Sequence, residues 1–361
     1  MTPAPAEGTW AVLAPNWLGD AVMCLPALAE WRRQRPQQPL RLYARPGVAP
    51  VFAAAGLGLD VRVTPRPRGT GLAALRELRR QADAAPEAAL LLPNSVHAAL
   101  AARALGARRI VGYARQGRRL LLTQAIARPR RGEIPEHESF YYLELLRRAG
   151  LIAALPAAPA AHLRAEPGLV AAWRARLPQL AGPRVAIHAG ASHDLAKRWL
   201  PERFAATAAA LAAGGAQVVL IGGGDERALA ARVRARAVAD GAPEARVVDL
   251  AGETSLAELL ALLTLCDLLI ANDSGPMHLA AALGTPVVAI FGPTRECATR
   301  PLAAPGRLRI VRAEGVACSP CKLARCPIDH RCMTRIAAAE VIAAAEAFLA
   351  RSGGPAAPAG G

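Results

Sequence analysis

Aromatic side chains are scarce in this sequence, at 4% of 361 residues. Proteins that bind single-stranded nucleic acid stack the bases on such side chains, so this chain offers few platforms of that kind. Its formal net charge is nevertheless +16 at pH 7. A positive field attracts anionic partners, although an arginine-rich and alanine-rich composition alone could produce the same excess. Nucleic acid is therefore disfavoured, and anionic lipids and phosphorylated sugars remain.

Long hydrophobic runs are also missing. The opening MTPAPAEGTWAVLAPNW has no basic leader followed by an apolar run and a small-residue cleavage site. The most apolar helical stretch, 256–271, is interrupted by Glu258 and Asp267 and is shorter than the about 20 residues that span a bilayer. Seven cysteines are too few for a disulfide scaffold in a chain of this length. We expect a cytoplasmic protein whose cysteines are thiols or metal ligands.

What is present is an alternation of short Val/Ile/Leu runs with Ala/Leu/Arg segments of helical period, which predicts parallel sheets covered by helices on both faces. The alternation occurs twice. A stretch rich in proline and alanine, 153–168, separates the two occurrences and is predicted to be an extended linker. Strands are predicted at 10–14, 40–44, 89–92, 109–112, 184–188, 217–221, 246–250, 268–271, 287–291 and 308–311. Helices are predicted in the first half at 21–34, 71–82, 96–105 and 138–149.

The predicted fold is therefore α/β, with two Rossmann-like doubly wound domains facing a central cleft, where open α/β sheets bind ligands. The first domain is expected over 1–165 and the second over 166–350, and the small residues of 351–361 predict a disordered tail. An enzyme is the leading class. A two-lobed periplasmic-type binding protein is the rival, and the missing export leader argues against it.

The loop after the first predicted strand reads PNWLGD and places Asp20 at the start of a helix. The carboxylate has two interpretations. It could cap the helix by accepting a hydrogen bond from a free amide, or it could act as a general base toward a substrate hydroxyl. The spacing alone does not decide between them. The loop lacks the G-x-G-x-x-G pattern that is typical of dinucleotide binding.

Three loops of the second half have the composition of a phosphate site. NDSGPMH, at 272–278, opens a helix, and the amides of Ser274, Gly275 and Met277 are expected to be free for a diphosphate. An ordinary capped helix with a packed histidine is the alternative. The other two loops contain Lys197, in HAGASHDLAKRW, and the glycines of GGGDE at 222–226. Each could contact a phosphate or a ribose, but a Lys-Arg pair is usually solvated and glycines are common in tight turns.

Together these motifs resemble the lipopolysaccharide ADP-heptose heptosyltransferases of glycosyltransferase family 9, and most closely heptosyltransferase II. The resemblance is carried, in this order, by PNWLGDAVMCLPAL, HAGAS, AKRW, VVLIGGGDE, DLAGETSLAELLALL, NDSGPMHLAAALGTPVVAIFGPT and CSPCKLARCPIDHRCM. It implies a GT-B architecture. It also implies an inverting transfer of L-glycero-D-manno-heptose from ADP-heptose to the inner-core heptose of lipopolysaccharide, without a metal or other cofactor.

The resemblance further implies roles for particular residues. Asp20 matches the catalytic base, and Lys197 matches the phosphate-binding lysine that also acts in the reaction. The other expected donor ligands are Ser192, Glu226 with Asp225 as its alternative, Asp273, Ser274, Gly275, Met277 and His278. The implied partners are ADP-heptose, a lipid-linked inner-core acceptor and the anionic inner membrane, with no nucleic acid. Heptosyltransferase I or III activity and a non-catalytic nucleotide-sugar-binding protein are the alternatives.

For the cysteines and the arginine clusters, the sequence leaves two questions open: whether the cysteines bind a metal and whether the arginines bind an anionic partner. Cys318, Cys321, Cys326 and Cys332 could hold a tetrahedral zinc, but only the first pair has zinc-ribbon spacing, and reduced thiols are favoured. Apolar surroundings predict that Cys24, Cys266 and Cys297 are small core residues. The arginines of 115–119 and 128–131 are either solvated or in contact with acceptor phosphates and the anionic membrane.

Overall fold

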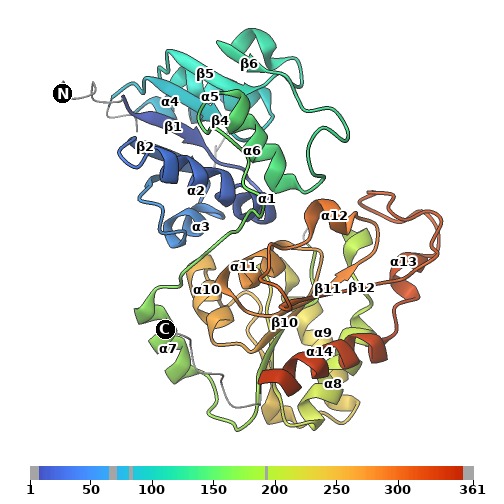
Figure 1. Ribbon diagram of the computed structural model, residues 1–361. Helices are drawn as coiled ribbons and strands as arrows, with labels where there is room; N and C mark the ends of the chain where they lie inside the picture. Colours follow the sequence, from blue (N-terminus) through green and yellow to red (C-terminus); the bar gives the residue numbers. More distant parts are fainter. Residues whose placement is uncertain (1–7, 65–70, 81–83, 192–193, 353–361) are drawn as a thin grey trace. The chain divides into compact units, whose positions relative to one another are not determined.

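The computed structural model describes residues 8–64, 71–80, 84–191 and 194–352. The chain divides into two compact units, Met1–Arg164 and Ala165–Gly361, which we call unit 1 and unit 2. Each unit is built on its own parallel sheet (Figure 1). None of the described helices combines the length and the apolar character that crossing a bilayer requires.

Unit 1 contains a six-stranded sheet in the order β3-β2-β1-β4-β5-β6, with every pair parallel. Its strands are β1 (Trp10–Leu13), β2 (Leu40–Ala44), β3 (Asp60–Val63), β4 (Ala88–Leu91), β5 (Arg109–Tyr113) and β6 (Gln124–Ile126). Its helices are α1 (Leu18–Met23), α2 (Leu25–Gln34), α3 (Ala49–Ala54), α4 (Gly71–Arg80), α5 (Val96–Ala104), the 3-10 turn η1 (Arg118–Leu121) and α6 (Glu138–Arg148).

The central strand β1 is buried along its whole length because helices cover the sheet on both faces. Alternate side chains of a strand point to opposite faces. Ala11 and Leu13 therefore join one apolar cluster with residues of α4 and α5. Trp10 packs edge to face against Trp31 of α2, with ring centroids 5.1 Å apart.

Unit 2 repeats this plan in the order β12-β11-β10-β7-β8-β9. Counted from its own first strand, the order is 3-2-1-4-5-6, as in unit 1, so the first and fourth strands are neighbours at the point where the order reverses. Its strands are β7 (Arg184–His188), β8 (Gln217–Leu220), β9 (Val247–Asp249), β10 (Leu268–Asn272), β11 (Val287–Phe291) and β12 (Leu308–Arg312). Its helices are α7 (Pro167–Arg176), η2 (Leu195–Lys197), α8 (Pro201–Ala213), η3 (Gly224–Glu226), α9 (Arg227–Ala239), η4 (Glu244–Arg246), α10 (Leu256–Thr264), α11 (Gly275–Leu283), α12 (Glu296–Thr299), α13 (Arg331–Thr334) and α14 (Ala338–Ser352).

The predicted α/β class with two doubly wound sheets is confirmed, but several predicted elements change. The helix predicted at 21–34 is divided at Cys24 into α1 and α2. The end of the predicted linker forms part of α7. Helix α14 extends into the predicted disordered tail, where Arg351 lies over the Phe348 ring at 4.7 Å. Residues 353–361 of that tail lie outside the described residues.

Candidate functional site

Asp20 lies just beyond the carboxyl end of β1, inside α1. The chain enters α1 at Leu18, and Trp17 holds the N-cap position with extended backbone angles (φ −98°, ψ 142°). Asp20 is therefore the third residue of the helix, and the interpretation of Asp20 as the N-cap is wrong. Its side chain is partly exposed in the first helical turn, where the helix dipole favours a negative charge.

Tyr142, on α6, contacts this carboxylate, and the sequence did not single it out. The Tyr142 hydroxyl lies 3.4 Å from Asp20 Oδ1. Burial, and after it the negative charge of Asp20, raises the pKa of Tyr142 well above its ordinary value. The phenol therefore stays protonated and donates to the carboxylate. The sequence offered only the run FYY at 140–142, which does not say which ring faces Asp20.

In unit 2, Lys197 and Asp273 were predicted as separate ligands but form an ion pair. Asp273 follows β10 directly and is 4% exposed. Lys197 Nζ lies 3.2 Å from Asp273 Oδ2 and 3.6 Å from Asp194 Oδ2. The pair joins the end of η2 to the residue that precedes Ser274. The predicted phosphate-binding lysine is thus held at the start of α11.

The amino end of α11 differs from the predicted diphosphate cradle in one respect. Ser274 is the N-cap residue, but its side chain makes no capping bond. The Met277 N–H donates to the Ser274 C=O at 3.2 Å, so the expectation that this amide is free is wrong. The amides of Ser274 and Gly275 come before the first helical hydrogen bond and face out of the helix end. His278 is buried in the next part of the turn, at 4% exposure.

A histidine that the sequence did not single out joins Glu226 to Ser274. His188 is the last residue of β7, with Nε2 3.0 Å from Glu226 Oε2 and Nδ1 3.0 Å from Ser274 Oγ. Glu226 is buried, whereas Asp225 is exposed. Of the two acids that the sequence left open, Glu226 is the one linked toward α11. His188 opens the HAGAS motif, but no spacing rule connects it to partners 38 and 86 positions later.

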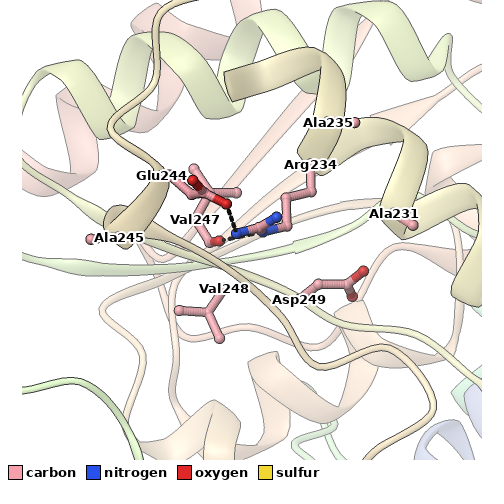
Figure 2. Close-up of a pocket in the computed structure, with 8 residues that line it drawn as sticks. All are labelled: Ala231, Arg234, Ala235, Glu244, Ala245, Val247, Val248 and Asp249. Atoms are coloured by element: carbon pink, nitrogen blue, oxygen red, sulfur yellow. Dashed lines mark hydrogen bonds and ion pairs between the residues drawn. The ribbon is translucent and has the colours of Figure 1, made fainter. Parts of the chain in front are cut away.

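Two hollows of unit 2 differ in what lines them. The first contains Lys197, together with Thr294, Arg295, Thr299 and Lys322, so that three cationic side chains border it. The second, larger hollow lies between α9 and the edge strand β9, where Arg234 is paired with Glu244 at 2.9 Å (Figure 2). None of the predicted site residues lines this second hollow, so we assign it no role. Ser192 lies outside the described residues.

The seven cysteines all lie in the described ranges of the chain, and none of them forms a disulfide. Within the described part of the chain, no group of three His, Cys, Asp or Glu side chains is placed to hold a metal ion. Burial, and then the nearby thiols Cys321, Cys326 and Cys318, raises the pKa of Cys332 to about 11. Cys24 and Cys266 are buried as predicted, but Cys297 is exposed because it lies on the short surface helix α12.

One arginine of the predicted anion-binding runs is not available for that role. Arg118 is 1% exposed and donates to the backbone carbonyls of Tyr113, Pro93 and Ser95. It fastens together the loops that follow β4 and β5, and burial lowers its pKa to about 10. The other arginines of the two runs are exposed, namely Arg115, Arg119, Arg128, Arg130 and Arg131.

Solved structures share this architecture over nearly the whole chain. The Escherichia coli ADP-heptose lipopolysaccharide heptosyltransferase II matches with a TM-score of 0.79 and 25% identity, covering 96% of this chain and 100% of that one. A glycosyltransferase of family 9 from Veillonella parvula DSM 2008 matches with a TM-score of 0.79 and 21% identity, covering 96% and 99%. The two doubly wound units therefore define a glycosyltransferase of the GT-B class.

Sequence relatives agree with the solved structures. Lipooligosaccharide heptosyltransferase 2 of Campylobacter jejuni is 38% identical over 108 residues, which are 30% of this chain and 33% of that protein. Lipopolysaccharide heptosyltransferase 2 of Salmonella typhimurium is 35% identical over 130 residues, 36% of each. These alignments span about a third of the relatives' length. The family model Glycosyltransferase family 9 (heptosyltransferase) matches residues 72–331. The chain belongs to glycosyltransferase family 9, as the motifs predicted.

Proposed function

We propose that this protein transfers L-glycero-D-manno-heptose from ADP-heptose to the inner-core heptose of lipopolysaccharide, as a heptosyltransferase II. The observation that carries the proposal is the Lys197–Asp273 ion pair directly before α11. It places a cation beside a helix end whose first amides face outward, which is the combination that binds phosphate groups. The named heptosyltransferase 2 relatives support the choice of sugar donor and acceptor.

Asp20 acts as the general base of a single displacement. It takes the proton from the acceptor hydroxyl while that oxygen attacks the anomeric carbon, and the bond to ADP breaks on the opposite face of the sugar. Positioned general bases contribute roughly 10²- to 10⁴-fold to such steps. Tyr142 orients the carboxylate by donating a hydrogen bond to Oδ1. The result is inversion at the transferred carbon.

Lys197 and the amides of Ser274 and Gly275 stabilise the negative charge that grows on the departing diphosphate. The dipole of α11 acts in the same direction. Glu226 accepts hydrogen bonds from the ribose hydroxyls, and Asp273 and His278 lie beside the donor sugar. A metal ion or other cofactor is not part of this mechanism, because a lysine and a helix end supply the positive charge that metals provide in other transferases.

The decisive experiment is to incubate the enzyme with ADP-heptose and a truncated inner-core acceptor and to determine the structure of the glycan formed. A new heptose linked to the inner-core heptose is the expected product. A heptose added elsewhere on the core would identify a type I or type III transferase instead. Binding of ADP-heptose without acceptor-dependent release of ADP would point to a non-catalytic nucleotide-sugar-binding protein.

We also propose that unit 1 contacts the anionic inner membrane from the cytoplasmic side, where the lipid-linked acceptor resides. The exposed Arg119 directly precedes Leu120, which is 89% exposed, and the exposed Arg115 lies earlier in the same segment. Basic residues next to an exposed apolar side chain favour an anionic lipid surface. Arginine-to-glutamine variants at both positions should bind phosphatidylglycerol vesicles less tightly and raise the acceptor KM. Unchanged values for both would overturn the contact.

A further inference from the structure

We infer that His188 is a positioning residue for the nucleotide: it fixes Glu226 toward the ribose and ties it to Ser274 at the start of α11. The inference rests on the proposed function, in which Glu226 binds the ribose. It concerns a residue for which the motifs suggested no role. Three features of the structure support this role: the place of His188 in the sheet, the constraints on Glu226 and the hydrogen-bonding capacity of the ring.

His188 ends the strand that lies between the two elements it connects. In the order β10-β7-β8, its strand pairs with β10 on one side and with β8 on the other. Ser274 follows β10, and Glu226 follows β8. Because parallel strands end at the same edge of a sheet, a side chain at the end of the middle strand can reach both neighbouring loops. The two distances of 3.0 Å show that His188 does so.

Glu226 is restrained on more than one side. Its Oε2 accepts from the Gly223 N–H at 3.0 Å as well as bonding to His188. The carboxylate also fills the space above Gly190, where a Cβ would lie 1.7 Å from Oε1. The side chains of His188 and Glu226 are only 6% and 9% exposed. A carboxylate held in this way cannot change rotamer to follow a ligand, so its direction is set before the nucleotide arrives.

The imidazole ring can make both hydrogen bonds in either protonation state. In the neutral ring, an Nε2–H donates to Glu226 while Nδ1 accepts from the Ser274 hydroxyl. In the charged ring, both nitrogens donate, and the Ser274 hydroxyl can donate instead to the Asn272 C=O, 3.1 Å away. The link between the ribose loop and the helix end therefore needs no particular charge on His188.

This link predicts how ligand binding depends on the ribose hydroxyls. If His188 acts through Glu226, then removing the His188–Glu226 hydrogen bond should weaken the binding of ADP. The binding of 2′,3′-dideoxy-ADP should not change, because this nucleotide lacks the hydroxyls that donate hydrogen bonds to Glu226. A buried histidine that merely stabilises the fold would affect both nucleotides equally. The ratio of the two dissociation constants therefore separates positioning from general stability.

The two nitrogens can be tested separately with a matched pair of variants. In His188→Asn, the asparagine side chain is long enough for its amide to take the place of Nδ1 and bond to Ser274, but it is too short to reach Glu226. His188→Gln can reach Glu226 in the place of Nε2. By titration calorimetry, we expect the wild type to prefer ADP over 2′,3′-dideoxy-ADP by about tenfold. The preference should be reduced in His188→Asn and retained in His188→Gln.

A double-mutant cycle completes the test. In the Glu226→Gln background, His188→Asn should produce no further change in the preference, because the two residues act as one unit. With ADP-heptose as substrate, His188→Asn should raise the donor KM and leave kcat nearly unchanged.

Retention of the full preference by His188→Asn would overturn the inference while leaving the proposed function intact. A wild-type protein that binds neither nucleotide would overturn the proposed function as well. If His188→Asn does not fold, the comparison of His188→Gln with the wild type still decides: loss of the preference in His188→Gln would contradict the link to Glu226.

Discussion

The two units share one sheet order, but the helix that follows the fourth strand is capped differently at its amino end. Both α5 in unit 1 and α11 in unit 2 begin after a serine at the N-cap position. In unit 1, Ser95 Oγ accepts from the Ala98 N–H at 3.2 Å, so the helix closes its own end. In unit 2, Ser274 makes no capping bond, and its hydroxyl is bound by His188. The same residue at the same topological place therefore leaves a helix end open only where a neighbouring strand supplies another partner.

The first strands of the units differ in a corresponding way. In unit 1, β1 leads after a short loop into α1 and its carboxylate, Asp20. In unit 2, β7 leads into a longer connection that contains η2 and Lys197 before α8 begins. One unit thus carries the proposed base, and the other carries the proposed phosphate ligands. Single substitutions in each unit can test this division of roles.

Asp20→Asn should lower kcat by about a thousandfold, because the acceptor hydroxyl loses its base. The dissociation constant for ADP, measured by calorimetry, should stay within about twofold, since the proposed nucleotide ligands all belong to unit 2. Asp60→Asn, on the edge strand β3, is the control and should be nearly neutral, because its ion pairs with Arg41 and Arg62 are exposed. Near-normal turnover in Asp20→Asn would remove Asp20 as the base.

Lys197→Met should lower kcat/KM for ADP-heptose by about a hundredfold, because a charge-assisted contact to the leaving diphosphate is lost. The variant also leaves Asp273 without its ion-pair partner, so ADP should bind more weakly too. Arg232→Met removes an exposed cation of the same unit and serves as the control. Equal kinetics for Lys197→Met and the control would contradict the role of the lysine.

Gly190→Ala should weaken ADP binding by about tenfold. The new Cβ would lie 1.7 Å from Glu226 Oε1 and would force the carboxylate away from its place. Gly214→Ala, at the end of α8, is the matched control, since its nearest contact would be an ordinary 3.4 Å. ADP titration of both variants checks the expectation. An unchanged dissociation constant for Gly190→Ala would show that the position of Glu226 does not matter for the nucleotide.

Ser95→Ala should lower the local stability of α5 by about 1 kcal/mol, because a capping bond is lost. Hydrogen exchange of the α5 amides, followed by mass spectrometry, measures this effect. Ser95→Thr keeps the capping oxygen and should remain close to the wild type. Neither change should alter ADP affinity, whereas Ser274→Ala should lower it. Loss of ADP binding in Ser95→Ala would break the contrast between the two helix ends.

The central strands were predictable from the sequence because both of their faces are buried. The short, continuous apolar runs of β1, β4, β7 and β10 are typical of strands in a parallel sheet that is covered on both faces. The edge strands β3 and β6 escaped prediction because they are short and partly exposed, so their apolar signal is weak. The break at Cys24 was also missed, since proline in the first turn of α2 fits a helix start as well as a kink.

The sequence by itself determined the family, the doubly wound sheets and the loops that carry the candidate ligands, because local composition and motif order are properties of the chain. Only the tertiary structure decided that Glu226 rather than Asp225 turns inward, that Tyr142 meets Asp20, and that Arg118 is enclosed. Tyr142 and Asp20 are 122 positions apart in the chain, and His188 and Glu226 are 38 positions apart. His188 and Glu226 meet because parallel strands end at a common edge of the sheet. Tyr142 meets Asp20 because α6 packs against α1, and both arrangements exist only once unit 1 and unit 2 have folded.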